Sequence, residues 1–247
     1  MSEVLVLIPA RYQSSRFPGK PLAPINGKSM IQRVYENVSE SGYDTFVVTD
    51  SDEIAKHLDT IKAKYLRVDD DVPSGTERIA LAYERNFLKK KYKLIINIQG
   101  DEPLLHAEEV KKLAKFHLDS QFDVATLVRK RKPEEADYKN PNVVKVAYSE
   151  KTGACFYFSR ASIPFDRDDE KNFSWFHHVG VYSYKAEPLL AFLKHPASVL
   201  EKIEKLEQLR ALEMGFTLGA SVTKYESIGV DTKEDIKKIE GVLSGKK

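Results

Sequence analysis

The chain has a single cysteine, Cys155, among 247 residues, which excludes an internal disulfide and a cysteine-rich zinc site. It also lacks any apolar run near the roughly 18 residues that a membrane-spanning helix requires. Neither charge is in excess, since 39 Lys and Arg residues balance 37 Asp and Glu residues to a formal net charge of +2. This balance argues against a general nucleic-acid-binding protein. Because no basic segment precedes the first apolar run, we expect no signal peptide, a cytoplasmic location, and no nucleic-acid or membrane partner.

Two common nucleotide-binding motifs are absent as well. The run Gly27-Lys28-Ser29 resembles the end of a P-loop, but that motif requires a glycine at position 22, where the chain has Leu22. No G-x-G-x-x-G sequence occurs, so dinucleotide-dependent redox chemistry has no support.

A long cationic loop follows the first apolar run, which occupies residues 4–8. The loop carries Arg11, Arg16 and Lys20 and no acidic residue, and proline or glycine at positions 9, 18, 19, 21 and 24 restricts its backbone. A stiff cationic loop at the carboxyl end of a first strand is a typical phosphate site in open α/β sheets. A solvated surface loop is the alternative, although it would not require a stiff backbone.

The first half of the chain alternates strand-like and helix-like segments. Strands are expected at 4–8, 45–50 and 93–98, and helices at 29–40, from 52, from 74 and at 107–118. This βαβαβα order predicts an α/β fold with a doubly wound, mostly parallel, Rossmann-like sheet.

The second half is richer in strands. They are expected at 122–128, 143–148, 155–158 and 178–184, followed by helices at 187–194 and 198–214, a short strand ending at 228–231 and a last helix from 232. We expect residues 1–247 to form a single domain, whose strand-rich middle supplies a small dimerisation arm.

The expected helix at 198–214 places two charges among apolar side chains. At about 100° per residue, Glu207 and Arg210 fall on the face formed by Leu200, Leu206 and Ala211. Charges on an apolar face are costly unless they are paired or placed at a cavity. The two side chains therefore either pair with each other within the helix or line a ligand site.

Two carboxylates, Asp101 and Asp231, come at the ends of expected strands. The carboxyl ends of parallel strands converge on one crevice, and Mg²⁺ needs only one or two carboxylates with water. The pair therefore predicts a magnesium site. Asp231 could instead cap the last helix, and Ser74 with Glu77 could form an ordinary capping box.

Seven sequence blocks in order resemble the sugar-acid cytidylyltransferases, and within them the 3-deoxy-manno-octulosonate cytidylyltransferase (CMP-Kdo synthetase) family. The blocks are P-A-R-Y at 9–12 with S-R-F-P-G-K-P-L at 15–22, S-G-T-E-R at 74–78, N-I-Q-G-D-E-P at 97–103, Y-F-S-R-A-S-I-P at 157–164, H-V-G-V-Y at 178–182, L-E-Q-L-R at 206–210 and G-V-D-T at 229–232. Together they extend over nearly the whole chain.

The resemblance implies a nucleotidyltransferase fold and a magnesium-dependent enzyme. Members join CTP to the anomeric hydroxyl of an eight-carbon 3-deoxy sugar acid and release pyrophosphate, are usually homodimers, and feed Gram-negative lipopolysaccharide biosynthesis. Nucleotidyl transfer through a charged transition state requires cations and metal rather than a covalent nucleophile. By resemblance, Arg11 and Lys20 bind the CTP phosphates and Arg16 lies near the α- and β-phosphates.

The resemblance also assigns the remaining roles. Arg16, Lys20 and Asp101 are expected to be catalytic, and Asp101 and Asp231 to hold Mg²⁺. The CTP-binding set is Ala10, Arg11, Lys20, Ser74, Gly75, Thr76 and Gly100. The sugar-acid-binding set is Gln99, Arg160, His178, Glu207 and Gln208. A strand histidine such as His178 is otherwise more often structural.

The chain departs from the family at Val72, where close members usually carry a histidine. Val72 and the pair His177-His178 are where a change of substrate would show. The alternatives are therefore the same chemistry on 8-amino-3,8-dideoxy-manno-octulosonate or on a sialic acid. A non-catalytic nucleotide-binding module is the alternative of another class.

Overall fold

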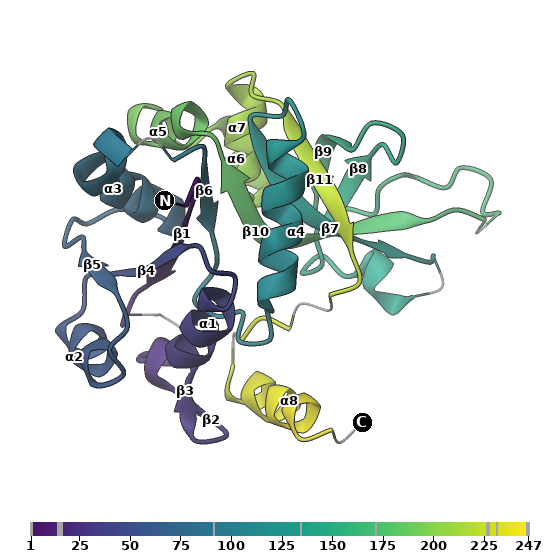
Figure 1. The fold of residues 1–247 in the computed structure, drawn as a ribbon. Coiled ribbons are helices and arrows are strands. Elements are labelled where there is room, and N and C mark those ends of the chain that lie inside the picture. Colours follow the sequence, from purple (N-terminus) through teal and green to yellow (C-terminus); the bar gives the residue numbers. More distant parts are fainter. Residues whose placement is uncertain are drawn as a thin grey trace. The chain divides into compact units, whose positions relative to one another are not determined.

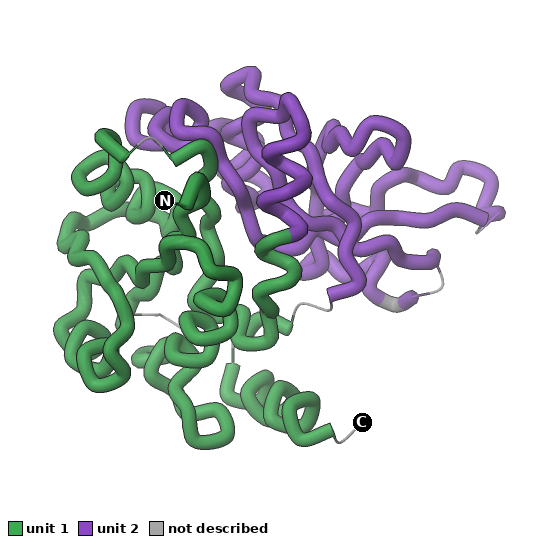
Figure 2. The backbone as a smooth tube through the Cα atoms, in the orientation of Figure 1, with its two compact units in different colours: residues 1–111, 227–247 green, residues 112–226 purple. Residues whose placement is uncertain are grey.

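The first apolar run forms strand β1 (Val4–Ala10), and each of its residues is buried. In the computed structural model, the described residues are 2–13, 17–90, 92–133, 135–170, 172–225, 228–230 and 232–245. The chain divides into two compact units, unit 1 with residues 1–111 and 227–247 and unit 2 with residues 112–226 (Figure 2). The expectation of a single domain over residues 1–247 stays a prediction.

Unit 1 contains a parallel sheet in the order β5-β4-β1-β6 (Figure 1). Its other strands are β4 (Asp44–Thr49), β5 (Tyr65–Arg67) and β6 (Leu94–Asn97), and β2 (Pro24–Ile25) pairs with β3 (Lys28–Ser29) in a separate hairpin. In β1, Leu7 pairs with Phe46 on one side and with Asn97 on the other. The reversal of strand order beside β1 places the chain segments that follow β1 and β6 at one edge.

Serine side chains define where the first helices of unit 1 begin. These helices are α1 (Met30–Ser39), α2 (Asp52–Thr60) and α3 (Gly75–Phe87). Ser29, Ser51 and Ser74 each accept a hydrogen bond from the backbone N–H three residues later, which satisfies an otherwise unpaired helix donor. Short 3₁₀ turns occur at Lys20–Leu22 and Leu88–Lys90, α4 is Ala107–Leu118, and α8 is Lys233–Leu243.

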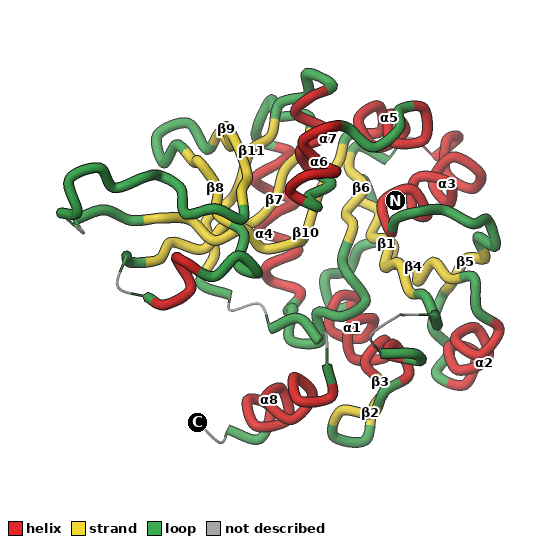
Figure 3. Tube along the Cα trace, turned by 180° about the vertical axis from the view of Figure 1, so that it is seen from behind, coloured by secondary structure: helices red, strands yellow, loops and turns green. Residues whose placement is uncertain are grey.

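Unit 2 has mixed strand pairing. Its strands are β7 (Val124–Arg131), β8 (Lys145–Tyr148), β9 (Ala154–Ser159), β10 (Trp175–Tyr184) and β11 (Leu218–Thr223), drawn in yellow in Figure 3. The order is β10-β7-β11-β9-β8, and β8 also pairs with β10. Only β7–β11 is parallel among these pairs. An α/β fold with mixed pairing is therefore confirmed, while unit 2 departs from the mostly parallel sheet that we expected.

The last strand differs from the sequence prediction. Residues 228–230 form no strand, and the final strand is instead β11. Its residues Gly219, Ala220 and Ser221 have low strand propensity, which explains why the pattern is weak. A Cβ on Gly219 would lie 2.1 Å from the Phe122 ring, so the small residue is required by packing against Phe122.

The expected helix at 198–214 is broken into two short helices, α6 (Val199–Glu204) and α7 (Gln208–Glu213). Helix α5 (Ala186–Lys194) precedes them. A 3₁₀ turn lies at Ala136–Lys139. Lys205 ends α6 with a left-handed backbone at φ 55°. Arg210, one of the two charges expected on the apolar face, pairs with Glu201, whose carboxylate oxygens lie 2.6 Å from Nε and Nη2.

No helix formed by the described residues is both long and apolar enough to cross a membrane.

Candidate active site

The loop after β1 places Lys20 against Asp101. Gly19 has a φ of 72° and precedes the 3₁₀ turn that begins at Lys20, so its left-handed backbone turns the chain there. The Lys20 ammonium donates to Asp101 Oδ2 at 2.6 Å and to the carbonyl of Val230 at 2.8 Å. The Val230 N–H in turn donates to the Asp101 carbonyl at 3.2 Å. Two oxygens from distant parts of unit 1 thus surround one cation.

Two predicted residues, Arg16 and Asp231, lie outside the described residues, so their roles stay predictions. The last helix is capped by Thr232, which forms a reciprocal capping box with Asp235. Among the described residues, no group of three or more His, Cys, Asp or Glu side chains could hold a metal ion. A magnesium ion that keeps several waters does not require such a group.

Arg11 contacts the segment that leads into α3. Its guanidinium donates to the carbonyls of Val72 and Ser74, the latter at 3.1 Å. Ser74 caps α3, and its hydroxyl donates to the Glu77 carboxylate at 2.7 Å. The capping role weighed for Ser74 is therefore present, and the cap also fixes the first N–H groups of α3 beside Arg11.

Pro9 packs against two of the predicted CTP-binding glycines. A Cβ on Gly100 would lie 2.9 Å from the Pro9 carbonyl oxygen, and a Cβ on Gly75 would lie 3.1 Å from Pro9 Cγ. Both positions therefore have little room for a side chain. Ala10, the last residue of β1, is 3% exposed.

Asn97 is a polar residue of this region that the sequence analysis missed as a site residue. It ends β6 and is fully buried. Its Nδ2 donates to Thr76 Oγ1, and its Oδ1 accepts from Gln99 Nε2, both at 3.4 Å. An asparagine at the end of an otherwise apolar strand was the available signal.

A cavity of about 580 Å³ lies beside Arg11. Its lining combines the loop after β1, the end of β4 and the segment after β5: Arg11, Tyr12, Gln13, Asp50, Ser51, Asp52, Glu53, Arg67, Asp69, Asp70, Asp71 and Arg78. Arginines and carboxylates alternate in this set, so the cavity is suited to a polar ligand.

In unit 2, Tyr182 connects three of the predicted sugar-acid residues. Its hydroxyl donates to Gln208 Oε1 at 2.9 Å, and its ring lies 5.3 Å from the His178 ring. Burial raises the pKa of Tyr182, and Tyr184 and the Glu207 carboxylate raise it further. Gln208 is 4% exposed, and its Nε2 has no hydrogen-bond partner among the described residues. A buried amide donor left without a partner suits a polar ligand.

Arg160 is held by backbone oxygens of unit 2. Its guanidinium donates to the carbonyls of Glu204 at 2.7 Å, Pro141 at 2.9 Å and Lys205 at 3.4 Å. The Glu204 carboxylate accepts from the Arg160 N–H and the Ser159 hydroxyl. Arg160 thus binds the backbone at the break between α6 and α7. Its contact with a substrate carboxylate stays a prediction.

Comparison with known proteins identifies the family. The family model described as Cytidylyltransferase matches residues 5–228. The chain belongs to the cytidylyltransferase family. A 3-deoxy-manno-octulosonate cytidylyltransferase of Thermodesulfovibrio yellowstonii is 41% identical over 97% of this chain and 98% of its own. An 8-amino-3,8-dideoxy-manno-octulosonate cytidylyltransferase of Shewanella oneidensis is 44% identical over 98% of each chain.

A solved structure titled as CMP:2-keto-3-deoxy-manno-octonic acid synthetase complexed with CTP is also similar to this cytidylyltransferase. The two chains share 32% identity and a TM-score of 0.91, with 100% of each chain covered. The resemblance drawn from the seven sequence blocks is therefore confirmed.

The paired histidines of this cytidylyltransferase lie in β10, where His178 is buried and His177 is partly buried. Burial lowers the pKa of His178 to about 3 and that of His177 to about 4. His178 Nε2 lies 3.0 Å from Thr126 Oγ1, which donates to the carbonyls of Val179 and Val181. Because the Thr126 proton goes to a carbonyl, the His178 N–H donates to Thr126. Both rings are therefore neutral at pH 7.

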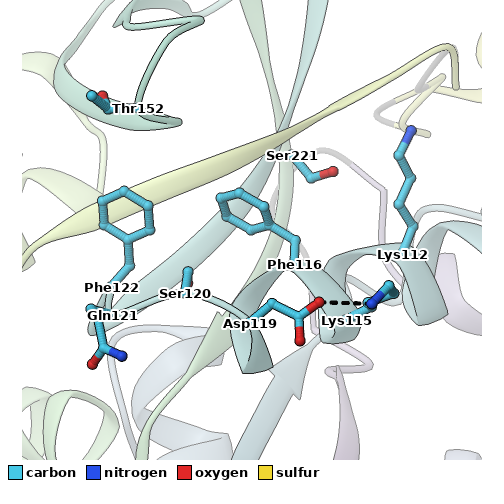
Figure 4. A pocket seen from close by; sticks show the side chains of 9 residues that line it. All are labelled: Lys112, Lys115, Phe116, Asp119, Ser120, Gln121, Phe122, Thr152 and Ser221. Carbon is cyan, nitrogen blue, oxygen red and sulfur yellow. Dashed lines mark hydrogen bonds and ion pairs between the residues drawn. The ribbon is translucent and has the colours of Figure 1, made fainter.

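A second cavity, of about 590 Å³, lies in unit 2 of the cytidylyltransferase (Figure 4). It is lined by Lys112, Lys115, Phe116, Asp119, Ser120, Gln121, Phe122, Thr152 and Ser221, and contains none of the residues predicted for the site. Lys115 pairs with Asp119 at 2.7 Å, which leaves a mixed surface of stacked Phe rings and short polar side chains.

Proposed function

We propose that this cytidylyltransferase joins CTP to 3-deoxy-manno-octulosonate, giving the CMP-sugar and pyrophosphate with Mg²⁺. The observation that carries the proposal is the Lys20 ammonium held between the Asp101 carboxylate and the Val230 carbonyl. A carboxylate is the kind of hard oxygen ligand that Mg²⁺ takes, and one or two suffice, so Asp101 and Asp231 would be the protein ligands. Relatives that are 38–41% identical over nearly the full chain carry the name of this activity.

The residues of unit 1 would bind and orient CTP. Lys20 and Arg11 neutralise phosphate charge, and Arg16 is assigned to the α- and β-phosphates between which the bond breaks. Ser74, Gly75 and Thr76 present backbone N–H groups and hydroxyls at the start of α3 to the base and ribose. Bound Mg²⁺ would supply charge stabilisation on the phosphate oxygens.

The residues of unit 2 would bind the sugar acid. Gln208 Nε2 is a buried donor without a partner among the described residues, and a substrate hydroxyl would satisfy it. Tyr182 holds the other end of this amide and so fixes which way the donor points. Glu207 is assigned to substrate hydroxyls, Arg160 to the carboxylate, and His178 to a neutral polar contact. Gln99, two residues after the end of β6 in unit 1, is also assigned to the sugar.

The substrate question is tested by pyrophosphate release. We expect CTP with 3-deoxy-manno-octulosonate to give rapid Mg²⁺-dependent release. Faster release with 8-amino-3,8-dideoxy-manno-octulosonate would favour the second candidate, which is supported by relatives of that name at 42–44% identity. CTP binding without release from either acid or from a sialic acid would support a non-catalytic nucleotide-binding module instead.

Further parts of the proposal concern assembly and context. A homodimer is proposed from the strand-rich middle of the chain, where Phe156 and Phe165 are 66% and 84% exposed. Light scattering on the purified protein tests the dimer, and loss of the dimer when both are changed to serine would support this arm. We also propose a doubly wound nucleotidyltransferase fold, a cytoplasmic location and a role in lipopolysaccharide biosynthesis.

A further inference from the structure

The segment between β5 and α3, residues 68–74, has no regular secondary structure, yet four of its carbonyls are bonded in a regular pattern. Arg78 donates to the carbonyls of Val68 and Asp70, the latter at 3.4 Å. Arg11 donates to the carbonyls of Val72 and Ser74. The alternate carbonyls at 68, 70, 72 and 74 are thus bonded by two guanidinium groups.

Arg78 is the buried member of this pair of arginines. It projects from the first turn of α3, is 1% exposed, and pairs with the Asp50 carboxylate at 2.7 Å. Its Nε is buried and has no hydrogen-bond partner among the described residues. Burial lowers the pKa of Arg78, the Asp50 carboxylate opposes that shift, and Arg11 adds to it. A charge this buried is costly unless the contacts that it makes repay the cost.

The charged side chains of the 68–74 segment contribute little to its order, because the ion pairs of Asp69 with Arg67 and of Asp70 with Arg85 are largely exposed. The segment contains three consecutive acids, Asp69, Asp70 and Asp71, which repel one another. It also ends in Ser74, where the proposed base and ribose contacts begin. The contacts that hold residues 68–70 in place therefore also determine the position of residues 72–74.

We infer that Arg78 is a positioning residue for CTP binding. Arg78 holds the carbonyls of the first half of the 68–74 segment, with Asp50 as its counterion, and thereby aligns Arg11 and the Ser74–Thr76 contacts. The inference rests on the proposed use of CTP. Arg78 does not touch the nucleotide in this account, and it acts through Arg11 and the start of α3. Its effect should therefore appear in CTP affinity rather than in the chemical step.

Arg85 offers a matched control. It lies on the same helix and contacts the same segment, but through the Asp70 carboxylate, at 2.6 and 2.9 Å, and its side chain is 48% exposed. Exposed side-chain ion pairs contribute little to the order of a segment. Arg85→Met should therefore leave CTP affinity within about twofold of wild type.

The test compares Arg78→Met, Arg78→Lys and Arg85→Met by calorimetric titration with CTP and by steady-state kinetics. Arg78→Met should weaken CTP binding by about tenfold, because the loss of buried charge-assisted hydrogen bonds has effects of this size. The KM for the sugar acid and kcat at saturating CTP should change by less than about twofold. Arg78→Lys keeps the charge beside Asp50 but not the planar fork, so it should recover only part of the affinity.

Amide hydrogen exchange supplies a readout independent of activity. In Arg78→Lys, exchange of residues 68–74 should be faster than in wild type without CTP and return toward wild type with CTP. Wild-type CTP affinity in Arg78→Lys, or an equal loss in Arg85→Met, would overturn the inference. An Arg78→Met variant that does not fold leaves the Arg78→Lys comparison to decide. Failure of the wild-type protein to bind CTP would instead overturn the proposed function.

Discussion

Replacing Gly100 with alanine should disturb both stability and CTP binding. The new Cβ would lie 2.9 Å from the Pro9 carbonyl oxygen, 3.6 Å from Ile31 Cδ1 and 3.8 Å from Ala10 Cβ. Carbon–oxygen contacts in proteins are usually about 3.3 Å or longer, so a shift of roughly 0.4 Å is required. The Pro9 oxygen belongs to a central strand and cannot rotate away as a flexible side chain could.

The magnitude follows from the cost of adding a methyl group to a packed site. Such overpacking costs about 1–3 kcal/mol, whereas replacing a glycine commonly gains up to about 1 kcal/mol from the unfolded chain. We therefore expect Gly100→Ala to lower the free energy of unfolding by about 1–2 kcal/mol. The shifted Pro9–Ala10 backbone leads into the loop that carries Arg11 and Lys20, so the KM for CTP should rise by more than the KM for the sugar acid.

Two other glycines make this a graded test. Gly75→Ala brings Cβ to 3.1 Å from Pro9 Cγ, and the nearest atom to a Cβ on Gly229, among the residues that the structure describes, is Glu102 Oε1 at 3.9 Å. Urea unfolding should rank the losses as Gly100→Ala, then Gly75→Ala, then Gly229→Ala. A Gly100→Ala protein with wild-type stability and wild-type KM for CTP would refute the reasoning, as would an equal loss in Gly229→Ala.

Further predictions concern charge. Lys20→Ala should reduce kcat by about a hundredfold or more, with the free energy of unfolding changed by less than about 1 kcal/mol; full turnover would remove Lys20 from the mechanism. Asp101→Asn should abolish the magnesium dependence of pyrophosphate release, and an unchanged titration would contradict a metal role. Glu201→Gln should cost about 3–5 kcal/mol in urea unfolding because it removes the carboxylate charge that pairs with the buried Arg210 guanidinium, and a smaller loss when Arg210→Met is added would confirm this cause. Burial lowers the pKa of His117 to about 4, whereas the unfolded state binds a proton below about pH 6.5. The stability contributed by the neutral imidazole of the folded state is therefore fully present above that pH. The free energy of unfolding falls by about 2 kcal/mol per buried histidine on going to pH 5. His117→Gln should reduce that slope between pH 7 and pH 5, and an unchanged slope would exclude this histidine as a cause.

The local features of the site could be predicted from the sequence. A strand at residues 4–8, the Ser74 cap and a helix at residues 107–118 follow from periodicity and capping signals; all three are present, and the strand extends to Ala10. Lys20 and Asp101 were expected in one site from strand order and family resemblance, and they are in contact.

Features that depend on distant contacts could not be predicted in this way. The pattern at 198–214 is that of one helix, but the helix breaks after Glu204, where Arg160, the residue after β9, donates to the carbonyls of Glu204 and Lys205. Arg78 lies inside the S-G-T-E-R block and was expected only as part of it. Besides the Asp50 carboxylate, its partners are the backbone carbonyls of Val68 and Asp70, which do not depend on the identity of the residues that supply them.

The same contact type bears on Val72, where the family resemblance led us to expect a histidine. Arg11 contacts the Val72 carbonyl rather than its side chain, so this contact persists whatever residue occupies the position. Val72 is itself 9% exposed, so its side chain adds apolar packing at this position. A Val72→His variant should therefore leave Arg11 in place, and any change in its CTP or sugar-acid KM would report the imidazole alone. Equal kinetic constants in both proteins would show that this departure from the family is neutral for catalysis, while a change in the sugar-acid KM alone would tie position 72 to the choice of acid.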